Sequence, residues 1–201
     1  MARGVGLHFA SVRAFLDWNE SQSERYELVR GTPTMHPGTN RGHERIAKRV
    51  FRELIAQVDS EIFDVNKSDF ALETGVGDYN EPVVRYPDIV IDRQTGNDDD
   101  RIAISPVVVI EVLSRSTGKI DTTIKAEEYG SVATIKTYIV FDREKPIARV
   151  WRRARDGAWP TEPLEIGADE LIELPEVGAV IEMGRIYDSR RRPVQGPIRD
   201  S

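Results

Sequence analysis

The sequence predicts an α/β fold in which a mixed central sheet is flanked by helices and accompanied by additional β-strands. Two runs, 107–113 and 137–142, are almost wholly apolar, which is typical of strands buried on both faces of a sheet. Within 43–58 apolar residues recur every four positions, which predicts an amphipathic helix of about 15 residues. From about residue 61 the pattern changes from helical to extended. Helices and buried strands in one chain of this length predict a mixed sheet.

The first elements are short. Residues 9–19 predict a helix with Ser11 as its N-cap, because apolar residues gather on one side of the segment. Residues 25–31 and 32–35 predict two short strands around a glycine turn. A loop rich in proline and glycine, 37–42, then precedes the amphipathic helix.

The middle of the chain predicts several strands. Residues 62–65 and 69–73 are two candidates separated by polar residues. Residues 83–91 predict one strand that contains Pro87. Because proline cannot donate a backbone hydrogen bond, we expect this strand to enter the sheet late or to run at an edge. A polar loop over 92–104 leads to the first apolar run.

The last third alternates helical and extended patterns. Residues 120–131 predict a helix between the two apolar runs, and 148–153 predict a half-exposed strand because apolar and polar residues alternate there. Short strands are expected at 171–174 and 177–183, and a final helical turn near 186–187.

The chain of 201 residues contains no internal repeat and no linker-like segment. We therefore expect a single domain over 1–201, with a core from about 11 to 188 and a basic C-terminal tail at 189–201.

Composition excludes several kinds of chemistry. The chain has no cysteine, which excludes disulfides, thiolate nucleophiles and iron–sulfur centres. Its three histidines, His8, His36 and His43, all lie in the first quarter. Oxygen ligands must therefore carry any metal chemistry, and these favour Mg²⁺, Mn²⁺ or Ca²⁺. No run approaches the roughly 20 apolar residues of a membrane helix, and the N-terminus lacks a signal-peptide core, so we expect a cytoplasmic protein without membrane contact.

The net charge of −6 is unevenly distributed. Residues 1–60 carry nine Lys and Arg against seven Asp and Glu, 61–111 carry four against twelve, and 112–201 carry fifteen against fifteen. The middle segment therefore supplies the whole deficit. A solvated loop at 97–100 accounts for three of its acids but not for Asp88 or Glu111.

Asp88 and Glu111 are the candidate metal ligands. Glu111 interrupts an apolar strand, and a buried carboxylate needs a cation, a metal or a proton. Asp88 begins a second apolar segment and could supply a second carboxylate from a neighbouring strand. Each has a structural alternative: an ion pair between Glu111 and an arginine, and a turn or cap role for Asp88 after Pro87.

Two carboxylates on adjacent strands suit a hard divalent ion that polarises a phosphate. Such a site also needs a cation near the developing charge on phosphorus. The residue two beyond Glu111 shares its strand face but is Leu113. Lys125 in the following helix is the best substitute and Lys119 a weaker one. The alternative for Lys125 is a surface pair with Asp121, four residues earlier.

Four blocks, in this order and spacing, resemble the Uma-type family of putative restriction endonucleases, which are bacterial proteins of the PD-(D/E)XK nuclease superfamily. The resemblance runs from about residue 11 to 188. The blocks are Arg-Tyr-Glu-Leu-Val-Arg-Gly at 25–31, Arg-Tyr-Pro-Asp-Ile-Val at 85–90, Val-Ile-Glu-Val-Leu-Ser-Arg-Ser-Thr at 109–117, and Asp121 with Lys125 and Tyr129.

The resemblance implies a restriction-endonuclease-like fold and an endonuclease that uses Mg²⁺ or Mn²⁺ and no organic cofactor. Asp88 and Glu111 match the metal-binding acids of the superfamily, and Glu27 matches an additional acid near the site. The family lysine, displaced from strand to helix, matches Lys125. Glu27 has the alternative of an exposed strand glutamate.

Two other functions compete with an endonuclease. One is an inactive nucleic-acid-binding or assembly protein on the same fold, and the other is a hydrolase that uses Ser114 with Lys125.

DNA is the partner that the resemblance implies, and cleavage of both strands would favour a homodimer. The candidate DNA contacts are Arg41, Arg45, Arg49 and His43, around the start of the amphipathic helix. The alternative is a solvated helix face, because basic residues around an apolar stripe are ordinary. His43 could equally position the N-terminus of that helix.

Overall fold

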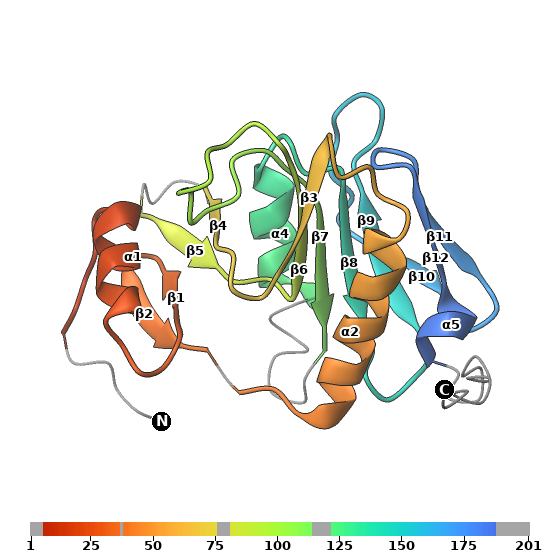
Figure 1. Ribbon diagram of the computed structural model, residues 1–201, viewed down its shortest axis with the longest axis horizontal. Coiled ribbons are helices and arrows are strands. Elements are labelled where there is room, and N and C mark those ends of the chain that lie inside the picture. The colour runs from red at the N-terminus through yellow and green to blue at the C-terminus, as the bar shows by residue number, and fades with distance from the viewer. Residues whose placement is uncertain (1–5, 37, 76–80, 114–121, 188–201) are drawn as a thin grey trace, which may run out of the picture.

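The computed structural model describes residues 6–36, 38–75, 81–113 and 122–187. Its largest element is a six-stranded sheet in the order β10-β9-β8-β7-β6-β3. The neighbours β7 and β8 are parallel and all other neighbours are antiparallel, which confirms the expected mixed central sheet (Figure 1). The strands are β3 (Phe63–Lys67), β6 (Ile89–Arg93), β7 (Pro106–Val112), β8 (Thr137–Phe141), β9 (Ala148–Arg152) and β10 (Leu164–Ile166).

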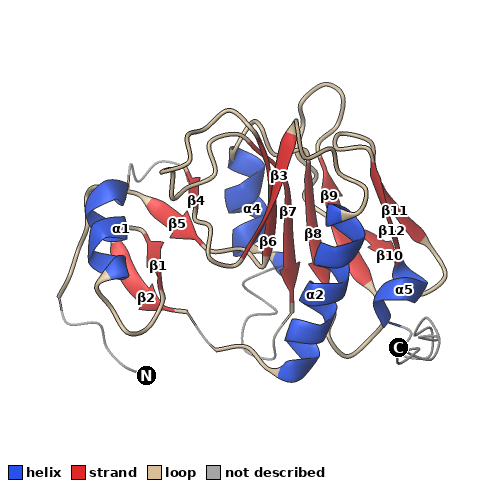
Figure 2. Ribbon diagram, in the orientation of Figure 1, coloured by secondary structure: helices blue, strands red, loops and turns tan. Residues whose placement is uncertain are grey.

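Helices cover both faces of this sheet (Figure 2). On one face α2 (Arg41–Ile55) packs its apolar stripe against alternate residues of the strands, including Ile110 and Ile139. On the other face α4 (Ile124–Ser131) packs through Ala126 and Tyr129 against the residues between them, including Val109. Because helices cover both faces, every residue of β7 and β8 is buried. This burial explains why nearly all residues of the two strands are apolar.

A second sheet of four strands, in the order β2-β1-β5-β4, lies to one side of the central sheet (Figure 1). Helix α1 (Val12–Glu20) covers one face of it and begins at Ser11, whose hydroxyl accepts a hydrogen bond from the backbone N–H of Ala14 at 3.4 Å. The turn between β1 and β2 has left-handed backbone at Arg30 (φ 48°) and Gly31 (φ 70°), as a two-residue hairpin turn requires. The strands are β1 (Tyr26–Val29), β2 (Thr32–Met35), β4 (Leu72–Thr74) and β5 (Val83–Arg85).

The segment 83–91 differs from the expectation of a single strand. It forms β5 in the small sheet and β6 in the interior of the central sheet, and Pro87 lies between them. Proline lacks the N–H that a continuous ladder needs, so the chain leaves one sheet and enters the other at this point. The alternative of an edge strand is therefore wrong, whereas the expected late entry agrees with β6, which begins only after Pro87. The break joins the two sheets directly before Asp88.

The end of the described chain forms a two-stranded sheet, β11 (Leu171–Leu174) with β12 (Ala179–Glu182), followed by α5 (Met183–Tyr187). These elements pack against α2. Strand β10 was not among the expected elements. None of the described helices is both long and apolar enough to cross a membrane.

Candidate active site

Glu111 lies near the end of β7 and points to the face of the central sheet that α4 covers. It shares that face with Val109, two residues earlier, which packs in the same cluster as Ala126 and Tyr129 of α4. Glu111 is 5% exposed, so its carboxylate is removed from water. The structure therefore confirms that the polar residue in this apolar run is buried.

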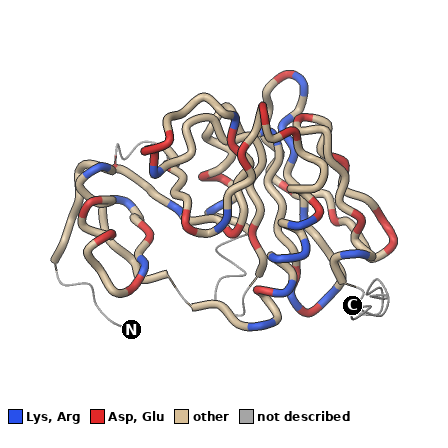
Figure 3. Tube along the Cα trace, in the orientation of Figure 1, with Lys and Arg blue, Asp and Glu red and all other residues tan. Residues whose placement is uncertain are grey.

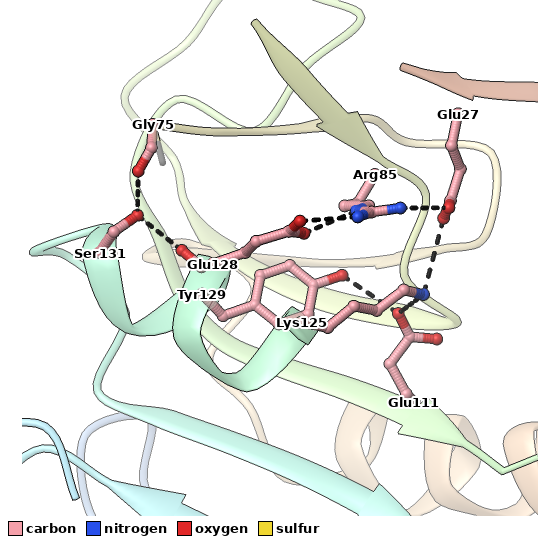
Figure 4. Close-up of polar contacts among 8 residues, drawn as sticks. All are labelled: Glu27, Gly75, Arg85, Glu111, Lys125, Glu128, Tyr129 and Ser131. Atoms are coloured by element: carbon pink, nitrogen blue, oxygen red, sulfur yellow. Dashed lines mark hydrogen bonds and ion pairs between the residues drawn. The ribbon is translucent and has the colours of Figure 1, made fainter. Parts of the chain in front are cut away.

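Two residues of α4 contact the Glu111 carboxylate (Figure 4). Lys125 Nζ lies 2.7 Å from Glu111 Oε1, and the Tyr129 hydroxyl donates to the same oxygen at 3.1 Å. Lys125 and Tyr129 are four residues apart, which puts both on one side of the helix. Lys125 is itself 5% exposed and so is not a surface lysine, and Asp121, the partner considered for it, lies outside the described residues. Among the described residues, the cation that contacts Glu111 is Lys125, from the helix that follows the strand.

Asp88 is brought beside Glu111 by strand pairing. Ile89, the first residue of β6, pairs with Ile110 of β7, so Asp88 lies directly before β6 and close to the end of β7 that carries Glu111. Asp88 is buried, and its Oδ2 accepts a hydrogen bond from the backbone N–H of Val112 at 2.7 Å. The second contact of this oxygen is with His43 Nε2, at 2.9 Å.

Glu27 reaches the site from the small sheet. Leu28 pairs with Val84, so Glu27 of β1 and Arg85 of β5 lie opposite each other on the face turned away from α1. Glu27 Oε1 lies 3.6 Å from Lys125 Nζ, and Glu27 Oε2 accepts from Arg85 at 2.8 Å. The side chain is buried, so the alternative of an exposed strand glutamate is wrong.

Arg85 joins the small sheet to α4. Its guanidinium makes a two-pronged contact with the Glu128 carboxylate, at 2.6 Å through Nε and 2.7 Å through Nη2, while Nη1 binds Glu27 (Figure 4). Such paired Arg–carboxylate contacts are among the strongest charged hydrogen bonds in proteins. Arg85 thus fixes where Glu27 lies relative to Lys125.

Burial and charge shift three pKa values in this cluster. Burial alone would raise the pKa of Glu27, but the Lys125 and Arg85 cations outweigh it and hold that pKa below its usual value. Burial opposes protonation of Arg85, yet its hydrogen bonds and charge contacts with Glu128 and Glu27 raise its pKa. Burial, followed by the charge of Glu111, raises the pKa of Tyr129 well above its usual value. At neutral pH the site therefore holds charged Glu27 and Arg85 beside a protonated tyrosine.

Asp88 and Glu111 suit a divalent cation by their chemistry and charge. Asp88 offers carboxylate oxygens from directly before β6 and Glu111 from the adjacent β7, and Mg²⁺ is commonly bound by one or two carboxylates together with waters and substrate phosphates. Within the described part of the chain the buried cluster contains four carboxyl side chains and two basic ones, a formal excess of two negative charges. The described residues include no group of three or more acids or histidines arranged to hold a metal by themselves.

The other predicted site residues are distributed as follows. His43 is buried and lies against Asp88, so it belongs to this cluster. Arg49 donates from Nη1 to the backbone carbonyl of Ile186 at 2.7 Å and thereby ties α2 to α5. Arg41 and Arg45 are exposed on α2. The residues Ser114, Lys119 and Asp121 and the basic tail lie outside the described residues.

Reasoning from the sequence did not assign roles to three residues of the cluster: Arg85, Glu128 and Tyr129. Arg85 and Tyr129 belong to the sequence blocks that resemble the family, but the residues around each of them do not indicate that its side chain points toward the site. Glu128 carried no signal, because a helix glutamate is ordinarily solvent-exposed. The spacing Lys125–Glu128–Tyr129 predicts one shared helix side, and this was the available clue.

Comparison with known proteins agrees with this architecture. A crystal structure of a putative nuclease of the DUF820 group from Anabaena variabilis superimposes with a TM-score of 0.62 at 14% identity, covering 83% of this chain and 91% of that one. An uncharacterized protein of Synechocystis sp. is 24% identical over 178 residues, which are 88% of this chain and 90% of the relative. The Uma2 family, described as "putative restriction endonuclease", matches residues 12–183. The chain therefore belongs to the Uma2 family of putative restriction endonucleases.

Proposed function

We propose that this protein is a DNA endonuclease that hydrolyses phosphodiester bonds with the help of Mg²⁺ or Mn²⁺. One observation carries the proposal: two buried carboxylates lie on neighbouring segments, Asp88 directly before β6 and Glu111 near the end of the adjacent β7, and a buried lysine lies 2.7 Å from Glu111. Family membership supports the same reaction class.

Asp88 and Glu111 are the residues that would hold the metal ion. A bound divalent ion polarises a phosphoryl oxygen and lowers the pKa of an attacking water. Both acids are held in place before any ion binds, Asp88 by the Val112 N–H and His43, and Glu111 by Tyr129 and Lys125. Such fixed ligands need little rearrangement to bind an ion.

Lys125 supplies positive charge at the site. Its ammonium is held between Glu111 and Glu27, at 2.7 and 3.6 Å, where it can stabilise the negative charge that develops on the phosphoryl group or orient the attacking water. Removal of both carboxylates and lysine from bulk water strengthens this interaction. Glu27 acts as a positioning residue, because it contacts Lys125 and is itself held by Arg85.

A cleavage assay tests the proposal. Supercoiled plasmid and single-stranded DNA are incubated with purified protein in Mg²⁺, in Mn²⁺ and in EDTA. We expect nicking only with a divalent ion, and its loss in Asp88→Asn and Glu111→Gln. Asp64→Asn is the matched control, because Asp64 is an exposed acid on the neighbouring strand β3. Equal cleavage by wild type and Asp88→Asn would refute the proposed mechanism.

A second function, a nucleic-acid-binding or assembly protein without activity, is favoured by one observation. Glu111 Oε1 already accepts from Lys125 and Tyr129, so a metal ion at this oxygen would have to displace or share these contacts. This function predicts DNA binding without metal-dependent cleavage.

The third hypothesis, a hydrolase using Ser114 and Lys125, predicts cleavage in EDTA that Ser114→Ala abolishes. A homodimer, which double-strand cleavage would favour, is tested by light scattering of the protein with and without duplex DNA.

A further inference from the structure

Four basic residues form a straight row along the exposed side of α2, and we call them the basic stripe: Arg41, Arg45, Lys48 and Arg52. Their spacings are four, three and four residues. At about 100° of rotation per residue, all four fall within about 60° of the helix circumference. Each is exposed, and the structure shows Lys and Arg positions recurring along α2 (Figure 3).

The core fixes the direction in which the basic stripe faces. Ile46, Val50 and Leu54 of the same helix are buried against the central sheet, on the side of α2 opposite the basic stripe. The helix cannot rotate without exposing this apolar surface, and so the four cations remain directed to solvent.

Within the described part of the chain, no member of the basic stripe makes a hydrogen bond or an ion pair with another side chain. Neighbouring cations, in contrast, have partners within the protein: Arg49 donates to the backbone carbonyl of Ile186, and Arg185 forms an ion pair with Glu53. The two acids of α2 lie outside the stripe, and Glu44 accepts a hydrogen bond from Thr39. Like charges three and four residues apart disfavour a helix, so an external anion along this side would relieve their repulsion.

The length and position of the basic stripe suit a nucleic-acid backbone. The eleven steps from Arg41 to Arg52 span about 16 Å, and along the axis of a duplex this length contains about five phosphates of one strand at 3.4 Å each. The stripe begins in the helical turn that also carries His43, whose side chain points to the buried side of α2, where its Nε2 lies 2.9 Å from Asp88. A strand along the stripe would therefore lie about one helix diameter, roughly 10–12 Å, from the candidate active site.

We infer that the basic stripe of α2 binds the phosphate backbone of the DNA that the site acts on. The inference rests on the proposed function for its choice of partner but does not require cleavage. The main alternative polyanion is an anionic membrane. A helix that lies in a membrane surface buries apolar side chains in the lipid, whereas the apolar side of α2 is buried in the protein core.

Salt-dependent binding tests the inference. Anisotropy of a labelled 30-base-pair duplex is measured in EDTA over a series of NaCl concentrations, so that no cleavage occurs. The test variant is Arg41→Gln/Arg45→Gln/Lys48→Gln/Arg52→Gln. The control is Arg13→Gln/Lys136→Gln/Lys145→Gln/Arg155→Gln, which removes four exposed cations elsewhere and gives the same net charge. Circular dichroism and thermal melting establish that both variants fold.

Each lost phosphate contact lowers the slope of log K against log[salt] by about 0.9, so loss of four contacts should lower the slope of the test variant by about 3.6 and weaken its binding at least tenfold, while the control keeps the wild-type slope. Equal slopes in the two variants would overturn the inference. So would stripe-dependent binding to anionic vesicles without binding to DNA. If the wild type binds DNA through the basic stripe but shows no metal-dependent nicking, the proposed nuclease is refuted and the inference about the basic stripe is kept. If the wild type nicks DNA but the test variant keeps the wild-type salt slope, the inference about the basic stripe is refuted and the proposed nuclease is kept.

Discussion

Lys125 Nζ lies 2.7 Å from Glu111 Oε1 although the two residues belong to different elements, a helix and a strand, and both are buried. Two opposite charges removed from water in this way depend on each other, because each is the main compensation for the desolvation of the other. The pair therefore links the stability of the site to its chemistry, and several consequences can be measured.

Lys125→Met should destabilise the protein strongly. Removing one partner of a buried ion pair leaves the other charge uncompensated, and the expected loss in free energy of unfolding is about 3–5 kcal/mol. Urea denaturation measures the change. The double variant Glu111→Gln/Lys125→Met should recover part of the loss, since neither charge is then left alone. Additive losses in the double variant would contradict a direct pair.

Arg85→Met should also destabilise the protein, because it leaves Glu27 and Glu128 buried without their shared cation. The matched control is Arg101→Met. Arg101 also bridges two acids, Asp17 and Glu20, but it does so near the surface. We expect a loss of about 3 kcal/mol or more for Arg85 and less than about 1 kcal/mol for Arg101. Equal losses in urea denaturation would argue against the bridging role of Arg85.

Glu27 should make stability depend on pH in the acid range. Its pKa is lower in the folded protein than its usual value of 4.5, because Lys125 and Arg85 outweigh the effect of burial. The unfolded chain therefore binds more protons, so this contribution is fully present above about pH 4.5 and disappears as the pH falls through the folded pKa. In urea denaturation, Glu27→Gln should flatten the loss of stability below pH 4.5. Glu73→Gln, an exposed acid on β4, should leave the acid dependence unchanged.

Divalent ions should stabilise the folded protein against heat. A ligand that binds only the folded state raises the melting temperature, by about 2–4 °C for each kcal/mol of binding free energy in a chain of this size. We expect Mn²⁺ and Mg²⁺ to raise the melting temperature of the wild type and of Asp64→Asn, but not of Asp88→Asn or Glu111→Gln. A rise of equal size in all four proteins would indicate that the ions bind elsewhere.

The sequence by itself determined the mixed α/β class of the fold and singled out Asp88 and Glu111 as candidate site residues. The apolar runs that became β7 and β8, and the four-residue period of α2, are local patterns that burial imposes wherever such elements pack. Glu111 was recognisable because a carboxylate within such a run must find a partner. The quoted sequence blocks pointed to the family, which the match over residues 12–183 confirms.

Only the tertiary structure decided which partners these residues have. Pro87 divides 83–91 between two sheets, and this division carries Arg85 and Glu27 to the side of α4 that presents Lys125. These contacts join residues that are far apart in the sequence, up to the 98 positions between Glu27 and Lys125. Local periodicity cannot predict contacts over such separations. Burial of Glu27, Glu128 and Lys125 likewise follows from the packing of one sheet beside another, because each would be an ordinary exposed residue on its own element.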